Sequence, residues 1–147
     1  MTSSTNKMNS NQKGNMVEGK AIAYYTSLGY QVFTSIGDGD VDLVYINDKG
    51  KAIRVQCKHG NYIKTNITFN VYCSGPNMKT KTYHGKVDEF FVYCLINKKS
   101  YIVPIKKVGT GKFTMRTVAV ANNQKKKINW AKDYQVAEEG GLAAHGC

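Results

Sequence analysis

Two short segments that flank a turn constrain the fold of this chain most strongly. Residues 52–58 (AIRVQCK) place apolar side chains at the odd positions 53, 55 and 57 and polar ones at 54, 56 and 58. Such alternation is typical of a β-strand with one buried face. Residues 41–46 (VDLVYI) have strand character too, and residues 47–50 (NDKG) between them predict a hairpin turn. The sequence therefore predicts a β-hairpin with one face in a hydrophobic core.

The register of this hairpin decides which polar side chains meet. Leu43 and Tyr45 join the apolar face of the partner strand if the hairpin loop has three or five residues, and that register sets Asp42 near Gln56. A loop of four residues would set Asp42 opposite a valine instead. We predict the register that gathers Asp42, Gln56 and Lys58 together.

The gathered groups fit a site for a divalent cation. A carboxylate from Asp42 and an amide oxygen from Gln56 suit Mg²⁺, which prefers oxygen ligands and keeps several waters, and Mn²⁺ is the alternative ion. The backbone carbonyl of Cys57 is a further expected ligand. Lys58 could orient or help deprotonate an attacking water, or offset negative charge at a phosphorus centre. Glu18 would add a second carboxylate if its helix packs beside the hairpin.

A helix is predicted from Gly14 to Leu28, ahead of the hairpin. Apolar side chains at positions 17, 21, 24, 25 and 28 lie on one face, and Gly29 supplies a stop. Glu18 lies about 100° round the helix from Val17, so it borders the buried face.

The rest of the chain predicts more strands than helices. Further strands are expected over residues 30–36, 66–73, 87–96, 101–105 and 113–120, a short helix over 128–134, an exposed loop over 74–86 and a basic loop over 122–127. Residues 1–12 and 137–147 are expected to be disordered, and 13–136 to form one domain.

The net charge indicates a nucleic-acid partner. The 147 residues include 21 Lys and Arg against 10 Asp and Glu, a net charge of +11, which favours a polyanion over a merely solvated basic surface. Most basic residues would meet phosphates, and asparagines could read base edges. The expected DNA contacts are Asn77, Lys79, Lys81, Tyr83, His84, Lys86, Lys112, Arg116, Lys125 and Lys126.

The sequence shows no membrane or secretion signal. No apolar run approaches the roughly 18 residues that a membrane span needs, and Met1 to Asn15 lack the apolar core of a secretory signal. The four cysteines are far apart and have no C-x-x-C spacing, which argues against a zinc site. We expect a cytoplasmic protein in a bacterial or phage setting.

The order of the candidate residues resembles the PD-(D/E)XK nuclease superfamily. That superfamily places an acid at the start of one strand and (Asp/Glu)-x-Lys on its hairpin partner, after a helix that carries another acid. The segments KGNMVEGKAIAYYTSLGYQVFTSIGDGDVDLV, IRVQCKHG, YHGKVDEFFVYCLINKKSYIVPI and INWAKDY together are similar to the small homing endonucleases encoded in group I introns. The resemblance covers about Asn11 to Tyr134.

The resemblance implies a fold and a set of catalytic residues. The expected fold is α/β with a restriction endonuclease-like core, in which helices flank a mixed β-sheet. Glu18 is then the helix acid, Asp42 the metal-binding aspartate, and Lys58 the motif lysine. Glutamine at position 56 replaces the usual acid, and a similar glutamine occurs among the homing enzymes. Valine stands in place of the motif proline, and Asp40 is the second candidate for the metal-binding aspartate.

The resemblance implies a Mg²⁺-dependent, site-specific cut in double-stranded DNA. Because one chain carries one active site, cutting both strands predicts a homodimer or a homotetramer. The alternatives are a Holliday junction resolvase or a restriction-type nuclease of the same superfamily, and a DNA-binding module that has lost catalysis.

Overall fold

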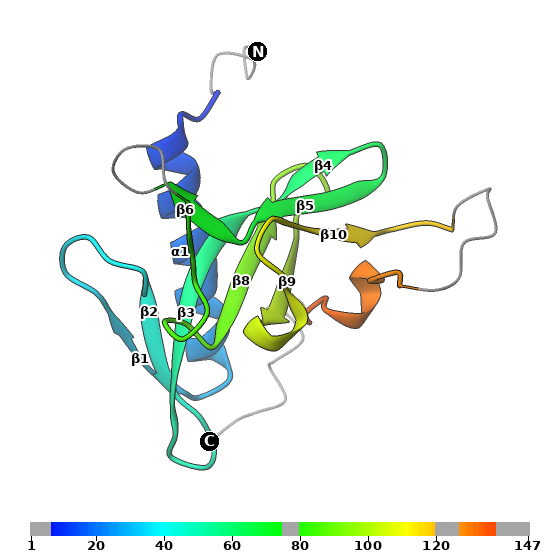
Figure 1. The fold of residues 1–147 in the computed structure, drawn as a ribbon. Helices are drawn as coiled ribbons and strands as arrows, with labels where there is room; N and C mark the ends of the chain where they lie inside the picture. Colours follow the sequence, from blue (N-terminus) through cyan, green and yellow to red (C-terminus); the bar gives the residue numbers. More distant parts are fainter. Residues whose placement is uncertain (1–6, 75–79, 120–126, 138–147) are drawn as a thin grey trace.

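A five-stranded sheet forms the centre of the computed structural model, which describes residues 7–74, 80–119 and 127–137 (Figure 1). Two smaller sheets and one α-helix surround it. The elements are α1 (Ser10–Ser27), β1 (Gln31–Thr34), β2 (Leu43–Ile46), β3 (Ala52–His59), β4 (Asn61–Ile63), β5 (Asn66–Asn70), β6 (Tyr72–Ser74), β7 (Thr80–Thr82), β8 (Glu89–Cys94), β9 (Lys99–Pro104), η3 (Ile105–Lys107), β10 (Lys112–Arg116) and η4 (Ala131–Asp133).

The central sheet is mixed, as the sequence analysis predicted. Its strand order is β1-β2-β3-β8-β9, with β3 and β8 parallel and the other neighbours antiparallel. The three-stranded sheet β10-β5-β4 is a separate antiparallel sheet, and β6 and β7 form a hairpin.

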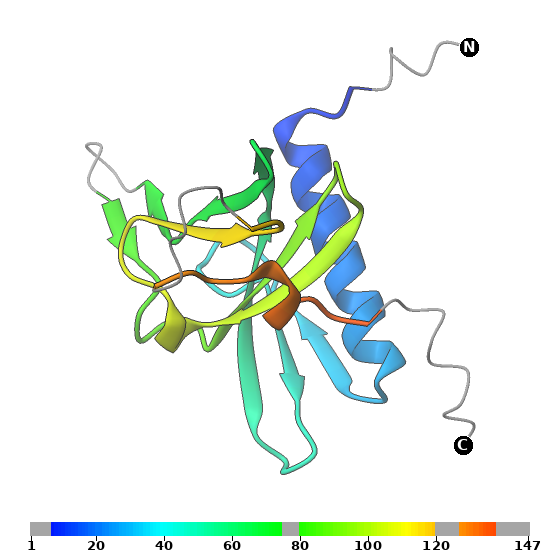
Figure 2. The ribbon, with the colours of Figure 1, turned by 90° about the vertical axis from the view of Figure 1, so that its right-hand side faces the viewer.

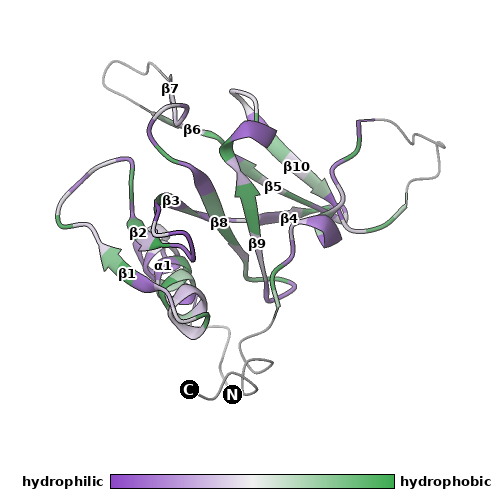
Figure 3. Ribbon diagram, turned by 90° about the horizontal axis from the view of Figure 1, so that it is seen from below, coloured by the Kyte–Doolittle hydropathy of each residue, from purple (hydrophilic) through white to green (hydrophobic). Residues whose placement is uncertain are grey.

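Different elements cover the two faces of the central sheet. Figure 3 shows α1 on one side of β8 and β9, and β5 and β10 on the other; Figure 2 gives the same arrangement from another direction. In β8, Phe91 packs in the core cluster on the α1 side, whereas Phe90 packs in the cluster beneath β5 and β10. Among the described residues, α1 therefore covers one face of the central sheet, and the sheet β10-β5-β4 covers the other.

The helix begins earlier than its apolar pattern indicates. Asn9 accepts a hydrogen bond from the Gln12 N–H at 2.9 Å, and the Gln12 side chain accepts one from the Asn9 N–H at 2.9 Å. This reciprocal capping box satisfies N–H groups that the first turn leaves unpaired. Residues 10–12 are therefore helical, and the prediction that they are disordered is wrong. Gly29, with φ at +88°, follows the helix end as expected.

The β2–β3 hairpin has the register that the sequence predicted. Five residues, 47–51, connect the strands, and Leu43 pairs with Val55. The Asn47 side chain accepts hydrogen bonds from the N–H groups of Lys49 and Lys51, each at 2.9 Å, which fixes the loop. Gly50 supplies a left-handed residue with φ at +76°.

Several boundaries differ from the prediction because they depend on distant contacts. β4 was not predicted, and it follows β3 directly through Gly60, where a Cβ atom would lie 2.9 Å from an Ile67 methyl. The expected strand 66–73 divides into β5 and β6 at Val71, whose N–H donates to the Gly111 carbonyl at 2.9 Å. β7 occupies part of the expected loop 74–86. The expected helix 128–134 is reduced to the short 3-10 turn η4, and the expected loop 122–127 lies outside the described residues except for Lys127.

In the ranges that the structure describes, no helix has the length and apolar character to cross a membrane.

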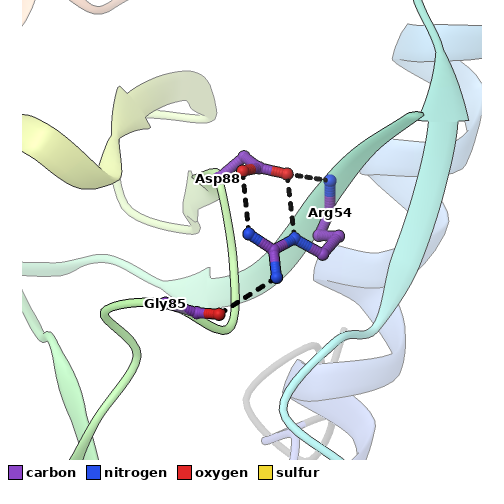
Figure 4. Close-up of polar contacts among 3 residues, drawn as sticks. All are labelled: Arg54, Gly85 and Asp88. Carbon is purple, nitrogen blue, oxygen red and sulfur yellow. Dashed lines mark hydrogen bonds and ion pairs between the residues drawn. The ribbon is translucent and has the colours of Figure 1, made fainter. Parts of the chain in front are cut away.

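An ion pair fixes the strand that carries the candidate active-site residues. Figure 4 shows the Arg54 guanidinium on Asp88, with Nε–Oδ2 at 3.1 Å and Nη2–Oδ1 at 3.0 Å, while Nη1 donates to the Gly85 carbonyl at 3.1 Å. Asp88 Oδ2 also accepts the Arg54 N–H at 2.8 Å. These bonds join β3 to the segment that leads into β8, so they hold β3 in register.

Asp88→Ala is expected to lower the free energy of unfolding at neutral pH by about 1–2 kcal/mol, measured by urea denaturation. The Arg54 side chain holds the pKa of Asp88 below its usual value, so this stabilisation is present above the unfolded pKa of about 3.9. It is lost as the pH falls through the folded pKa. Asp48→Ala, at the exposed hairpin turn, is the control. Equal unfolding midpoints for wild type and Asp88→Ala at pH 7 would contradict this role.

Candidate active site

Asp42 lies at the end of the β2 ladder, immediately before the first residue of that strand. Its N–H donates to the Val55 carbonyl at 2.9 Å, and its Oδ2 accepts the Cys57 N–H at 2.7 Å. The carboxylate thus accepts a backbone N–H of β3 at a point where the β2 ladder has ended. Because the N–H and C=O of one residue in an extended strand point the same way, the Cys57 carbonyl projects toward this carboxylate as well.

Gln56 and Lys58 lie on the face of β3 opposite to α1. Val55, which directly precedes Gln56 in β3, packs in the core cluster on the α1 side. Strand alternation therefore turns positions 56 and 58 to the other face. Gln56 Oε1 is buried and has no hydrogen-bond partner among the residues that the structure describes. A buried acceptor without a partner is costly and calls for a positively polarised group at that position.

Glu18 approaches Asp42 from the helix side. Partial burial raises the pKa of Glu18, and the charge of Asp42 raises it further, so the two carboxylates lie close enough to repel. Burial also raises the pKa of Asp42, against the Cys57 N–H and Lys58, which lower it. Asp42 in the plane of the sheet therefore interacts with an acid on one side and a lysine on the other.

These groups fit a hard cation. The carboxylates of Asp42 and Glu18, the amide oxygen of Gln56 and the backbone carbonyl of Cys57 are all oxygen donors, the kind that Mg²⁺ or Mn²⁺ accepts. The Cys57 thiol is unsuited to metal binding, since burial and the charges of Asp42 and Glu18 raise its pKa well above the usual value. Within the described residues, no group of three His, Cys, Asp or Glu side chains could hold a metal together.

Lys58 is held by Tyr83, a contact that sequence analysis missed. Lys58 Nζ donates to the Tyr83 hydroxyl at 3.0 Å and lies 4.7 Å from the centre of that ring. Burial lowers the pKa of Lys58, while Asp42 and Cys73 act in the opposite direction. The Tyr83 side chain is only 3% exposed, so its burial is incompatible with the predicted DNA contact. Tyr83 is instead a positioning residue for the lysine.

Tyr83→Phe is expected to move the limb of the pH–cleavage profile that reports Lys58 to lower pH by about 0.5–1 unit. The variant keeps the ring but removes the hydroxyl acceptor, which favours the charged amine. Tyr30→Phe, whose hydroxyl reaches only Asp48 at 3.4 Å, is the matched control. A pH profile of Tyr83→Phe identical to that of the wild type would show that the hydroxyl has no influence on Lys58.

Asp40, the second candidate for the metal-binding aspartate, is engaged elsewhere. Its Oδ2 lies 3.3 Å from Lys86 Nζ, and its Oδ1 lies 3.9 Å from the sulfur of Cys73. Asp42, by contrast, contacts β3 directly. The geometry favours Asp42 as the acid of the site.

The expected DNA contacts have different surroundings. Lys81, His84 and Lys112 are exposed, whereas Lys86 pairs with Asp40, which reduces its free charge. Arg116 is half-buried at the end of β10, and Lys112 begins that strand. Asn77, Lys79, Lys125 and Lys126 lie outside the described residues.

A partly buried acid, Glu89, which the sequence analysis did not single out, positions the helix that carries Glu18. Glu89 Oε2 accepts hydrogen bonds from the hydroxyls of Tyr25 at 2.6 Å and Tyr45 at 3.0 Å. The two tyrosine rings stack with their centres 4.2 Å apart. These hydrogen bonds join α1, β2 and β8. Partial burial raises the pKa of Glu89. In the sequence, Glu89 only precedes an apolar strand, so no local pattern marks its role.

Comparison with solved structures identifies the fold. The structure of the bacterial homing endonuclease I-Ssp6803I superposes with a TM-score of 0.66 at 20% sequence identity, covering 87% of this chain and 89% of that one. At this identity the likeness shows the fold alone, which is the restriction endonuclease-like α/β fold that we predicted. MepB matches at 12% identity over 74% of this chain and 85% of its own, with a TM-score of 0.35 that is too low to support an argument.

Comparison of sequences identifies the family. No curated protein sequence gives a significant match. The family model of the PD-(D/E)XK endonucleases matches residues 8–137, most of the chain and all the candidate active-site residues. The candidate site has the corresponding arrangement, with an acid before one strand and a lysine two residues beyond Gln56 on its partner. This chain therefore belongs to the PD-(D/E)XK endonuclease family.

Proposed function

We propose that this protein is a site-specific DNA endonuclease of the homing type, which makes a double-strand break by metal-dependent hydrolysis. The observation that supports the proposal is the register of the β2–β3 hairpin, which bonds Asp42 to the β3 segment that carries Gln56 and Lys58, in a chain of the PD-(D/E)XK family. The net charge of +11 supports a DNA substrate.

The side chains divide the chemistry between them. Asp42, Glu18, Gln56 Oε1 and the Cys57 carbonyl would hold a divalent cation, which polarises a phosphoryl oxygen and lowers the pKa of water. Lys58 takes a proton from the attacking water when neutral, or offsets charge on the phosphorus centre when protonated. Its lowered pKa makes both forms accessible closer to neutrality than for an exposed lysine. Tyr83 holds the amine in place.

The proposal includes self-association. One chain presents one such site, and a double-strand break needs two cuts on opposite strands. We therefore propose a symmetric homodimer or homotetramer acting on a partly palindromic target.

The test is cleavage of a genomic DNA library by the purified protein in Mg²⁺, followed by mapping of the ends. A single long target supports the homing type, short frequent targets support a restriction-type enzyme, and selective cutting of four-way junctions supports a resolvase. DNA binding without any cleavage in Mg²⁺ or Mn²⁺ would refute the nuclease proposal and leave a binding module.

A further inference from the structure

We propose that the outer face of the three-stranded sheet β10-β5-β4 is the surface on which this protein docks duplex DNA. The inference rests on the proposed function for its choice of polyanion. It goes further by assigning phosphate binding to one cavity and base reading to the neighbouring strand, both outside the candidate active site.

The outer face of β10 and β5 is polar and lacks acids, whereas β4 adds the exposed Ile63 beside Asn66. In β10, Phe113 and Met115 are buried in the core, so Lys112, Thr114 and Arg116 project from the opposite face. In β5, Ile67 and Phe69 are buried in the same way. The outward residues of the two strands pair across the sheet as Lys112 with Asn70, Thr114 with Thr68, and Arg116 with Asn66.

A basic cavity opens at the edge of this face. Its volume is about 370 Å³, and four cationic residues line it together with Thr114 and Asn129. The four are Lys107, Lys112, Arg116 and Lys127. Among the described residues that line the cavity, four carry a positive charge and none is a carboxylate. A phosphodiester of the DNA backbone supplies a negative charge and acceptor oxygens that suit such a lining.

β4 and β5 form a hairpin at one edge of this three-stranded sheet, and β5 is its central strand. β4 and β5 are joined by Lys64 and Thr65 alone, with φ at +47° and +67°, the tight turn that matches the twist of a hairpin. The Thr117 N–H and hydroxyl donate to the Thr65 carbonyl at 3.2 and 2.6 Å, which ties the tip to the end of β10. Figure 1 shows this hairpin projecting from the body of the molecule.

The side chains of this face have the chemistry that reads base edges. Asparagine can pair with the edge of adenine, and threonine contacts either donors or acceptors. Asn66, Thr68 and Asn70 provide three such side chains in a row on one strand. With the cavity cations fixing the register on the backbone, these three are placed to read bases.

The phosphate part of the proposal is tested by Lys112→Gln/Lys127→Gln. Binding of a fluorescent random-sequence duplex is measured by anisotropy without divalent metal, from low to physiological salt. We expect the affinity to fall about tenfold or more at low salt and the salt slope to shrink by about 2, since two phosphate contacts are removed. Lys49→Gln/Lys51→Gln removes two charges from the β2–β3 hairpin and should change neither. Equal losses in both variants would overturn the proposal.

The reading part is tested by Asn66→Ala/Asn70→Ala on a randomised duplex library in Mg²⁺. We expect altered base preferences at discrete target positions, with the thermal midpoint unchanged because both side chains lie outside the core. Wild-type preferences in this variant would overturn base reading by β5. If the wild-type protein cuts no DNA, the proposed function fails, while the anisotropy result still decides whether this face docks DNA.

Discussion

Lys58→Ala is expected to reduce DNA cleavage by about 10²–10⁴-fold or more while leaving duplex binding nearly unchanged. The lysine amine is half-buried, lies beside Asp42 and is fixed on Tyr83, so it is placed for the chemical step and not for general attraction of DNA. Single-turnover cleavage with excess protein separates the two effects. Lys51→Ala, an exposed lysine one residue before the same strand, should cleave like the wild type.

Lys58→Arg distinguishes the two roles of the amine. Arginine keeps a positive charge but cannot be deprotonated in proteins. If the lysine acts only by offsetting charge, Lys58→Arg retains part of the activity. If it takes a proton from water, Lys58→Arg is as inactive as Lys58→Ala. Full activity in Lys58→Ala would remove Lys58 from the catalytic set.

Asp42→Asn is expected to abolish metal-dependent cleavage without weakening the fold. The asparagine Oδ1 can still accept the Cys57 N–H, but the variant lacks the negative charge that a cation needs. We expect a loss of about 10³-fold or more, comparable to removal of a main electrostatic contributor. Asp40→Asn is the matched control and should retain cleavage, because Asp40 pairs with Lys86. The reverse outcome would make Asp40 the acid of the site.

Asp42→Asn is also expected to change the free energy of unfolding. Burial raises the folded pKa of Asp42 above its unfolded value, so ionisation of this group opposes folding. The contribution of Asp42 to the free energy of unfolding becomes less favourable as the pH rises from the unfolded pKa of about 3.9 through the folded pKa. Asp42→Asn should therefore be as stable as the wild type at acidic pH and equally or more stable at pH 7, measured by urea denaturation. A marked loss of stability at pH 7 would indicate a structural role for the carboxylate.

Local patterns predicted the register of the β2–β3 hairpin correctly. Alternation in residues 52–58 fixed which side chains face the core, and the apolar match of Leu43 and Tyr45 to that face fixed the hairpin register. Once the register is fixed, the positions of Asp42 and Gln56 beside each other follow. These are short-range constraints, and the sequence carries them fully.

Contacts between distant segments could not be predicted in the same way. Tyr83 stands among lysines, threonines and a glycine, a composition typical of an exposed loop. In the structure its ring packs against Phe90 and its hydroxyl accepts a hydrogen bond from Lys58. The outer face of β10 and β5 could not be predicted either, because residues 112–116 and 66–70 become neighbours only when the strands pair. For the same reason, the sequence did not predict that these strands form a separate sheet.

The most direct test of the account is the position of Mn²⁺ in crystals soaked with that ion, located by anomalous scattering. The account predicts a peak in contact with the Asp42 carboxylate and the Gln56 amide oxygen, absent from Asp42→Asn crystals grown and soaked identically. A peak bound only at other residues, with the side chains of Asp42 and Lys58 pointing to opposite sides of the sheet, would contradict it.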